Sequence, residues 1–174
     1  MPVPAVSGIC TLKGEDYMKR IASFEVNHTV LHPGLYVSRR ECNVTTFDLR
    51  FVRPNQGIYI PQDALHTIEH LGATYLRSHP VWQNKVIYFG PMGCRTGYYL
   101  LLHGWHDVAE KKSPPCVLVI SMLEYIVQFN GDIPGATAQE CGNYREHNLD
   151  DAKKWARRYL YELKNHPHFR YHES

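Results

Sequence analysis

The sequence predicts a single α+β domain with a mostly antiparallel sheet packed by helices. Its 174 residues are enough for one domain with a sizeable core. Segments rich in β-branched and aromatic residues alternate with segments of helical periodicity. Two of the strand candidates are joined by a short glycine-containing loop, as neighbouring antiparallel strands are.

The composition is that of a soluble globular protein, with 44% hydrophobic and 21% charged residues. A net charge of +2 gives no reason to expect a nucleic acid or membrane partner. The longest apolar run, 116–123, is far shorter than the roughly 20 residues of a membrane span. The first residues lack the pattern of a signal peptide, so we expect a cytoplasmic protein. Five scattered cysteines argue against a disulfide framework.

The chain divides into three parts. We expect an N-terminal extension at 1–22, a domain at 23–165 and an exposed tail at 166–174. Within the domain, strand candidates are 35–40, 44–52, 85–89 and 98–103. In the second strand, alternation places Phe47 and Leu49 on one face and Asp48 and Arg50 on the other, so Arg50 can face a pocket.

Three helices complete the domain. Pro61 suits the first turn of a helix that Pro80 ends. Residues 116–129 are apolar almost all round, which indicates a buried helix, although 116–120 would equally suit a buried strand. Apolar residues recur at helical spacing from 152 to 163, and residues 131–148 before them form an irregular loop.

The first of these helices carries the motif H-x-x-E-H. His66 and His70 stand one turn apart, with Cβ atoms about 5–6 Å from each other, so both imidazoles can bind one metal. Glu69 lies on nearly the same face and can reach a bound water or substrate. Chance alone gives this motif in roughly 4% of such sequences, so a solvated helix face stays open as the alternative.

Two cysteines add to this motif. Cys141 is the best third ligand, because Gly142 after it lets the backbone turn the sulfur toward a metal. Two His and one Cys leave one position open, as in a catalytic site. Cys94 lies between Gly93 and Gly97, where Arg95 or a nearby metal would favour a reactive thiolate. A purely structural role stays open for both thiols.

Taken in order, these motifs resemble the LuxS family of S-ribosylhomocysteine lyases. The resemblance runs from about 23 to 163. Its most specific part is the segment 90–97, G-P-M-G-C-R-T-G, combined with H-x-x-E-H and a downstream Cys-Gly. It implies a LuxS/inverzincin-like fold with eight site residues, namely metal ligands His66, His70 and Cys141, acid/base residues Glu69 and Cys94, and substrate-binding residues Ser23, His28 and Arg50.

The resemblance also implies an activity. The family cleaves S-ribosylhomocysteine to homocysteine and 4,5-dihydroxy-2,3-pentanedione, the precursor of the quorum-sensing signal autoinducer-2, within the activated methyl cycle. It implies a homodimer with sites at the interface and one divalent metal per subunit, natively Fe(II), with Zn(II) or Co(II) as substitutes. The sequence departs from many relatives at Asn27 and Tyr88, where those carry acidic residues.

Two other functions compete with this lyase. An inverzincin-like metallopeptidase would use Glu69 to activate water and would take a further ligand from Glu140 or Glu146. A non-catalytic, metal-stabilised binding module would need the metal for folding but not Glu69. The metallopeptidase needs no thiol between two glycines, so Cys94 separates it from the lyase.

Overall fold

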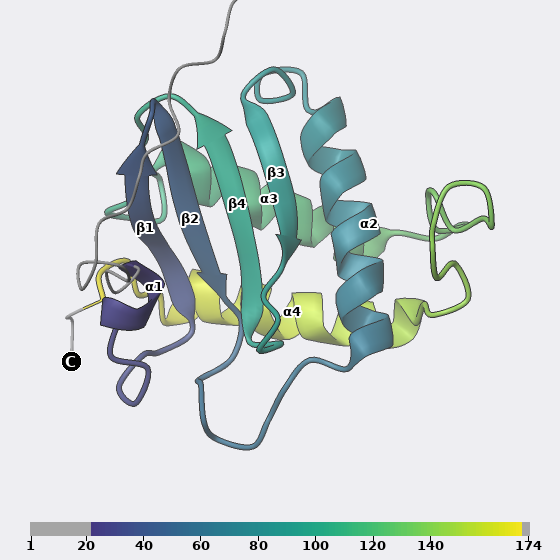
Figure 1. The fold of residues 1–174 in the computed structure, drawn as a ribbon, viewed down its shortest axis with the longest axis horizontal. Coiled ribbons are helices and arrows are strands. Elements are labelled where there is room, and N and C mark those ends of the chain that lie inside the picture. The colour runs from purple at the N-terminus through teal and green to yellow at the C-terminus, as the bar shows by residue number, and fades with distance from the viewer. Residues whose placement is uncertain (1–21, 172–174) are drawn as a thin grey trace, which may run out of the picture.

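The structure is a computed structural model, and it describes residues 22–171 (Figure 1). The predicted N-terminal extension therefore lies outside the described residues, apart from its last residue, and the boundaries of the three parts stay predictions. The elements in chain order are α1 (Ala22–Glu25), β1 (Gly34–Glu41), β2 (Val44–Arg50), α2 (Gln62–Ser78), β3 (Val86–Pro91), β4 (Gly97–His103), α3 (Pro114–Gln128) and α4 (Leu149–Asn165).

The four strands form one antiparallel sheet in the order β1-β2-β4-β3. Figure 1 shows α3 and α4 behind this sheet and α2 beside the edge strand β3. The predicted α+β class is confirmed. No helix in the described part of the chain has both the length and the apolar character to cross a membrane.

One side of helix α2 is buried in the core, and the other side carries the histidines and the glutamate of the H-x-x-E-H motif. Leu65, Ile68 and Leu71 are all buried in the core, as their helical spacing predicts. The phenol of Tyr98 on β4 donates to the Leu65 carbonyl at 2.9 Å, which ties the helix to the sheet. The three functional residues of the motif, on the remaining surface of α2, stay only partly buried.

Helix α3 resolves the alternative that the sequence left open at 116–120, since these residues are helical. Pro114 and Pro115 occupy its first turn, where no backbone N–H is required. Cys116 is fully buried, and burial raises the pKa of its thiol to about 11. This thiol is therefore a core residue.

The predicted alternation along β2 is confirmed, but both faces of the strand are buried. Phe47 and Leu49 belong to the core, while Asp48 and Arg50 on the opposite face are each only 2% exposed. Tyr171 explains part of this cover, because its ring stacks on Tyr36 at 4.7 Å and its phenol donates to Asp48.

The described end of the tail is docked rather than exposed. The backbone carbonyl of His168 accepts from the N–H of Leu35 at 2.9 Å, and the His168 ring stacks on His32. Phe169 packs against the core. The prediction of an exposed tail is wrong for 167–169 and 171, which are partly buried because aromatic side chains pack against the domain, while His166 and Arg170 are exposed.

Candidate active site

Four side chains converge beside α2 as a candidate metal centre. His66, His70, Cys141 and His147 each offer a ligand atom, and these atoms lie within 4.8 Å of one another. His66 and His70 come from α2, whereas Cys141 and His147 come from the irregular loop that precedes α4. The Cys141 sulfur lies 3.3 Å from Nε2 of His66. The structure thus brings the three predicted metal ligands together and adds a fourth residue.

Backbone carbonyls fix the two α2 imidazoles in one tautomer. Nδ1 of His66 lies 2.9 Å from the Glu146 carbonyl, and Nδ1 of His70 lies 2.7 Å from the Pro134 carbonyl. Because a carbonyl oxygen only accepts, each Nδ1 carries the proton and donates, which leaves the Nε2 lone pair free. Two free imidazole lone pairs and one thiol sulfur are a donor set that fits a divalent transition metal.

Gly135, rather than Gly142, is the glycine that this loop requires. Gly135 has φ +71°, and a Cβ atom there would lie 3.3 Å from Nδ1 of His70. A Cβ atom on Gly142 would meet no atom within 4 Å, and its φ is not positive. The expectation that Gly142 lets the backbone turn Cys141 toward the metal is therefore wrong.

His147 is the residue that the sequence did not reveal. Its ring stacks on His66 with centroids 4.1 Å apart and an interplanar angle of 23°. Burial, and then the neighbouring His66 and His70, lowers the pKa of His147 to about 4, so the ring is neutral. The only sequence signal was a further histidine six residues after Cys141, and no periodicity links it to α2.

Glu69 lines the same hollow as the metal centre, a space of about 510 Å³. Glu69 is a partly buried residue that lies between the two histidines in the sequence of α2. Glu140, which the metallopeptidase alternative would use, also lines this hollow. However, its carboxylate accepts a hydrogen bond from Thr137 at 2.7 Å and is not among the four grouped ligand atoms.

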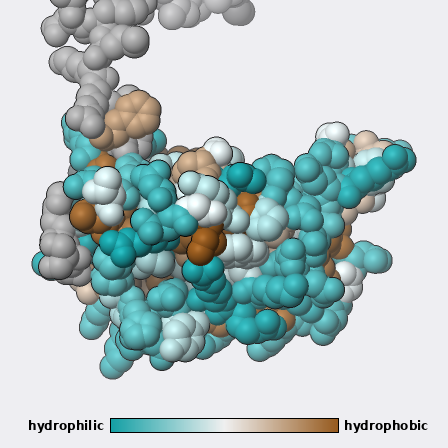
Figure 2. Space-filling model, turned by 90° about the horizontal axis from the view of Figure 1, so that it is seen from below, coloured by the Kyte–Doolittle hydropathy of each residue, from teal (hydrophilic) through white to brown (hydrophobic). Residues whose placement is uncertain are grey.

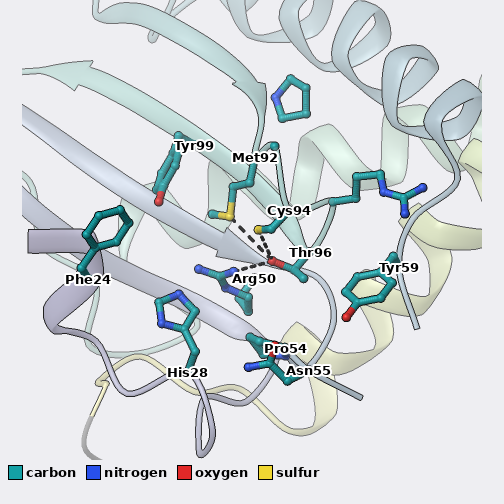
Figure 3. A pocket seen from close by; sticks show the side chains of 13 residues that line it. Phe24, His28, Arg50, Pro54, Asn55, Tyr59, Met92, Cys94, Thr96 and Tyr99 are labelled. Atoms are coloured by element: carbon teal, nitrogen blue, oxygen red, sulfur yellow. Dashed lines mark hydrogen bonds between the residues drawn. The ribbon is translucent and has the colours of Figure 1, made fainter. Parts of the chain in front are cut away.

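Cys94 lies in a different and larger pocket of about 690 Å³ (Figure 3). Arg50 at the end of β2 and Tyr99 on β4 form its floor, and Phe24 and His28 lie across from Cys94. Of the predicted substrate-binding residues, His28 and Arg50 therefore share this pocket with Cys94. Ser23 belongs to α1, beside Phe24, and its side chain lies outside the described part.

A buried hydrogen-bond chain leads to Cys94. Arg50 donates to Asp48 and to the Thr96 hydroxyl, whose oxygen lies 3.0 Å from the Cys94 sulfur. Burial by itself lowers the pKa of Arg50, but the charge of Asp48 and its hydrogen bond, with a smaller contribution from Cys94, raise it above the usual value. Arg50 therefore stays charged beneath Cys94.

Arg95, by contrast, turns away from Cys94. Its guanidinium lies 5.7 Å from the centroid of the Tyr59 ring, and its backbone has φ +57°. The positive φ of this loop thus falls on Arg95 and not on Gly93. Gly97 is required for another reason, since a Cβ there would lie 2.0 Å from the Leu49 carbonyl of the paired strand.

Within the described part of one chain, the two pockets have no lining residue in common. Glu69 faces the metal centre and Cys94 faces the pocket with Arg50, so the predicted acid/base pair is divided between them. Asn27 and Tyr88, the two departures from the family pattern, line neither pocket. The amide oxygen of Asn27 accepts from the Thr29 backbone instead, and Tyr88 is 47% exposed on β3.

Comparison with known proteins identifies the family. The family model described as S-ribosylhomocysteinase (LuxS) matches residues 21–169. The S-ribosylhomocysteine lyase of Borreliella burgdorferi strain ZS7 is 50% identical over 152 residues, which cover 85% of this chain and 94% of that protein. The lyases of Clostridium acetobutylicum and Phocaeicola vulgatus are each 46% identical, covering 85% and 86% of this chain and 94% and 92% of their own lengths. The chain therefore belongs to the LuxS family.

Proposed function

We propose that this protein is a metal-dependent lyase that cleaves S-ribosylhomocysteine to homocysteine and 4,5-dihydroxy-2,3-pentanedione. The observation that carries the proposal is the pairing of two features in a LuxS family member. One is the convergent set of His66, His70 and Cys141, and the other is an accessible thiol, Cys94, above a buried arginine.

The reaction needs groups that move protons between carbon atoms and between oxygen atoms. His66, His70 and Cys141 would hold a divalent metal, which would supply Lewis acidity toward a sugar carbonyl. We assign to Cys94 the transfer of carbon-bound protons as the carbonyl moves from C1 to C2 and then to C3. We assign to Glu69 the transfer of protons among the oxygens and the removal of the C4 proton. Loss of that proton expels the homocysteine sulfur from C5 by β-elimination.

The polar residues of the Cys94 pocket would hold the substrate. Arg50 offers a charge on a guanidinium that Asp48 and Thr96 hold in place, and His28 faces the same space. We propose that these two residues and Ser23 bind the substrate hydroxyls and keep its carbon atoms within reach of Cys94.

We further propose a homodimer in which each active site combines the metal centre of one subunit with the Cys94 pocket of the other. The division of Glu69 and Cys94 between two pockets supports this arrangement, since the reaction needs both at one substrate. Exposed apolar side chains close to the Cys94 pocket support it too, because Phe24, Ile58 and Tyr59 are 63%, 47% and 37% exposed. Figure 2 shows the molecule from below, where small apolar areas are scattered over a mostly hydrophilic face.

Mixed dimers test the shared site. We would mix Cys94→Ala and Cys141→Ala subunits after dissociation, each inactive as a homodimer. If the sites are shared, each mixed dimer contains one intact site, and random pairing restores about a quarter of wild-type activity. If each subunit carries a complete site, no mixed dimer has one, and activity stays at the level of the parents.

Thiol release from S-ribosylhomocysteine tests the activity itself. We would use oxygen-free protein loaded with Fe(II) or Co(II), with Cys94→Ala and Glu69→Gln as variants of unchanged metal content. We expect the wild type to release thiol and each variant to lose a factor of about 10² to 10⁴, as for a general acid or base. A fully metal-loaded wild type that releases no thiol would refute the lyase. A Cys94→Ala enzyme of undiminished activity would refute the assigned pair.

The metal, the compartment and the cellular role complete the proposal. We propose Fe(II) as the native metal, because a His, His, Cys set with an open position accepts Fe(II), Zn(II) or Co(II) and the family precedent favours iron. All four cysteines of the described part are free thiols, which suits a reducing cytoplasm. The product would feed autoinducer-2 signalling, and the released homocysteine would return to the activated methyl cycle.

A further inference from the structure

Thr96 connects two groups of the Cys94 pocket that have no direct hydrogen bond between them in the described structure. Its side chain is 2% exposed and lies between the Arg50 guanidinium and the Cys94 sulfur (Figure 3). Arg50 donates to its hydroxyl oxygen, and the same oxygen lies 3.0 Å from the sulfur and 4.0 Å from the Met92 sulfur. The direction of these hydrogen bonds decides what Thr96 can do.

Arginine has donors only, so the Thr96 oxygen must accept from Arg50. The single hydroxyl proton is then free for one of two sulfur atoms. The Cys94 sulfur is the closer one, and a thiolate accepts more strongly than the Met92 thioether. When Cys94 is ionised, every bond from Asp48 through Arg50 and Thr96 to the sulfur has its donor and acceptor aligned.

The protonated thiol fits this chain less well. If the thiol donates to Thr96, the threonine hydroxyl proton has only the Met92 sulfur at 4.0 Å as its partner in the described structure. We infer that Thr96 is a positioning residue that conveys the charge of Arg50 to Cys94 and favours the thiolate over the thiol. This inference rests on the proposed role of Cys94 as the proton-transferring thiol.

Other charged and titratable groups also line the Cys94 pocket, and any test must hold them constant. They come from each element around the pocket, namely His28 after α1, Arg50 on β2, Tyr59 before α2, Arg95 in the Cys94 loop and Tyr99 on β4. Thr96 is uncharged, so replacing it leaves all these charges in place. A change in the ionisation of Cys94 in a Thr96 variant can then be attributed to the lost hydrogen bond between Thr96 and the Cys94 sulfur.

The experiment measures the alkylation of Cys94 by iodoacetamide against pH in zinc-loaded protein, with each cysteine peptide resolved by mass spectrometry. Thr96→Val removes the hydroxyl at nearly constant volume. We expect it to raise the pKa of the Cys94 thiol by about 1 to 2, the loss of one hydrogen bond to a charged group. Thr96→Ser keeps the hydroxyl and should restore the wild-type profile. Exposed Cys42 is the internal reference in every sample.

Either variant could also disturb folding, so thermal unfolding is recorded alongside. Thr96→Ala serves as a second variant, because it leaves room for water beside Arg50 if valine proves too disruptive. An unchanged Cys94 profile in a folded valine variant would overturn the inference, as would a serine variant with the shifted profile. The alanine variant, in which water can replace the hydroxyl, should lie between the valine and wild-type profiles. Since alkylation needs no substrate, these outcomes are separate from any failure of the lyase assay.

His147 carries a second, independent inference at the metal centre. Nδ1 of His147 lies 3.2 Å from the Thr67 hydroxyl, whose proton is already donated to the Asp63 carbonyl. Nδ1 must therefore donate, and Nε2 has the lone pair. Nε2 is buried and has no hydrogen-bond partner among the described residues. A buried ring nitrogen with a lone pair and no hydrogen-bond partner is what a metal-ligating histidine would also show.

The ring geometry argues against coordination. Two imidazoles on one tetrahedral ion, with metal–nitrogen bonds of about 2.1 Å, hold their ring centres roughly 5 Å apart. The His66 and His70 rings meet this requirement at 4.6 Å and 88°. The His147 ring meets it against His70, at 4.8 Å and 69°, but lies only 4.1 Å from the His66 ring and nearly parallel to it, so it does not meet the requirement together with His66. We propose that His147 holds the plane of His66 by stacking and is not itself a ligand.

Substitution by alanine and by phenylalanine separates stacking from coordination. Because a phenyl ring can stack but cannot bind a metal, His147→Phe should keep cobalt affinity within about threefold of wild type. His147→Ala should lose about tenfold, as for other residues that orient a ligand. The visible absorption bands of bound Co(II) should keep their positions in the phenylalanine variant. Shifted bands, or equal losses in both variants, would overturn the proposal. A wild type that binds no cobalt would instead refute the metal centre.

Discussion

Cys141 and Cys94 each place a sulfur atom in a pocket, and the fold surrounds the two sulfur atoms with groups of opposite character. Electron-pair donors surround Cys141, whereas a buried cation lies near Cys94. Around Cys141 the neighbours are imidazoles, and those of His66 and His70 donate their Nδ1 protons to backbone carbonyls, so lone pairs converge. No Lys or Arg is among the described residues that line this hollow. Around Cys94 the fold supplies its own cation, the buried Arg50, which Asp48 holds in turn. The first pocket is complete only with a metal ion, whereas the second is complete within the chain. This difference predicts which perturbation affects which pocket.

The largest expected effect is on the buried charge pair. Asp48→Asn keeps the shape of the side chain but leaves Arg50 without its counter-charge, at 2% exposure. Breaking a buried pair in this way costs about 3–5 kcal/mol of the free energy of unfolding. Chemical denaturation of zinc-loaded protein measures the cost.

A matched surface pair provides the control for this change. Arg39 and Glu41 lie 3.2 Å apart on β1, with side chains 39% and 69% exposed. Glu41→Gln should therefore cost less than about 1 kcal/mol. If both variants lost the same small amount, Asp48 would not be holding a charged Arg50, and the contrast between the two pockets would fail.

Removing the metal should affect only the pocket around Cys141, and not the pocket around Cys94. At a free zinc concentration of 100 times the dissociation constant, binding stabilises the fold by about 2.7 kcal/mol. For a chain of this size that corresponds to roughly 5–11 °C in the unfolding midpoint. Differential scanning calorimetry with and without chelator should show this shift in wild type and in Cys94→Ala.

The shift should vanish in Cys141→Ala at the same zinc concentration, because one of the three ligands is lost. Equal shifts in the two cysteine variants would mean that zinc stabilises the protein at some other site. A shift that disappears in Cys94→Ala as well would mean that the two pockets are not independent within one chain.

The sequence predicted the four strands and the helices α2, α3 and α4 because each has a local signature, but it did not predict the four-residue helix α1. The strands have alternating or β-rich segments, α2 has a proline on either side, and α4 has a regular apolar spacing. The same local logic placed His66 and His70 on one side of α2, since residues four apart share a helix face. Cys141 was predicted from its place in a loop before Gly142, and the family resemblance agreed, although its loop conformation has no periodic signal of its own.

Proximity along the chain was a poorer guide within the loops. Arg95 is adjacent to Cys94, yet its guanidinium lies over the Tyr59 ring, 5.7 Å from the centroid. The cation connected to Cys94 is Arg50, which reaches it only through the pairing of β2 with β4. His147 meets α2 through a similarly distant contact. Such contacts depend on tertiary packing, which a single sequence does not display.

The smallest expected effect separates two glycines that the sequence treats alike. Gly135 has φ +71°, and a Cβ there would lie 3.3 Å from Nδ1 of His70. Gly135→Ala should therefore cost about 1–2 kcal/mol of stability from the left-handed backbone. It should also weaken zinc binding, because the added methyl group would press on the imidazole that donates to the Pro134 carbonyl.

Gly142→Ala is the matched control, since it adds the same methyl group to the same loop where no atom lies within 4 Å. We expect a change of less than about 0.5 kcal/mol and unchanged zinc affinity. Competition with a chromophoric chelator measures the affinity, and thermal unfolding of metal-free protein measures the backbone cost separately. If Gly142→Ala were the one that lost zinc, the turn at Cys141 would be shaping the centre after all. The orientation of His70 by the Pro134–Gly135 turn would then be the lesser constraint.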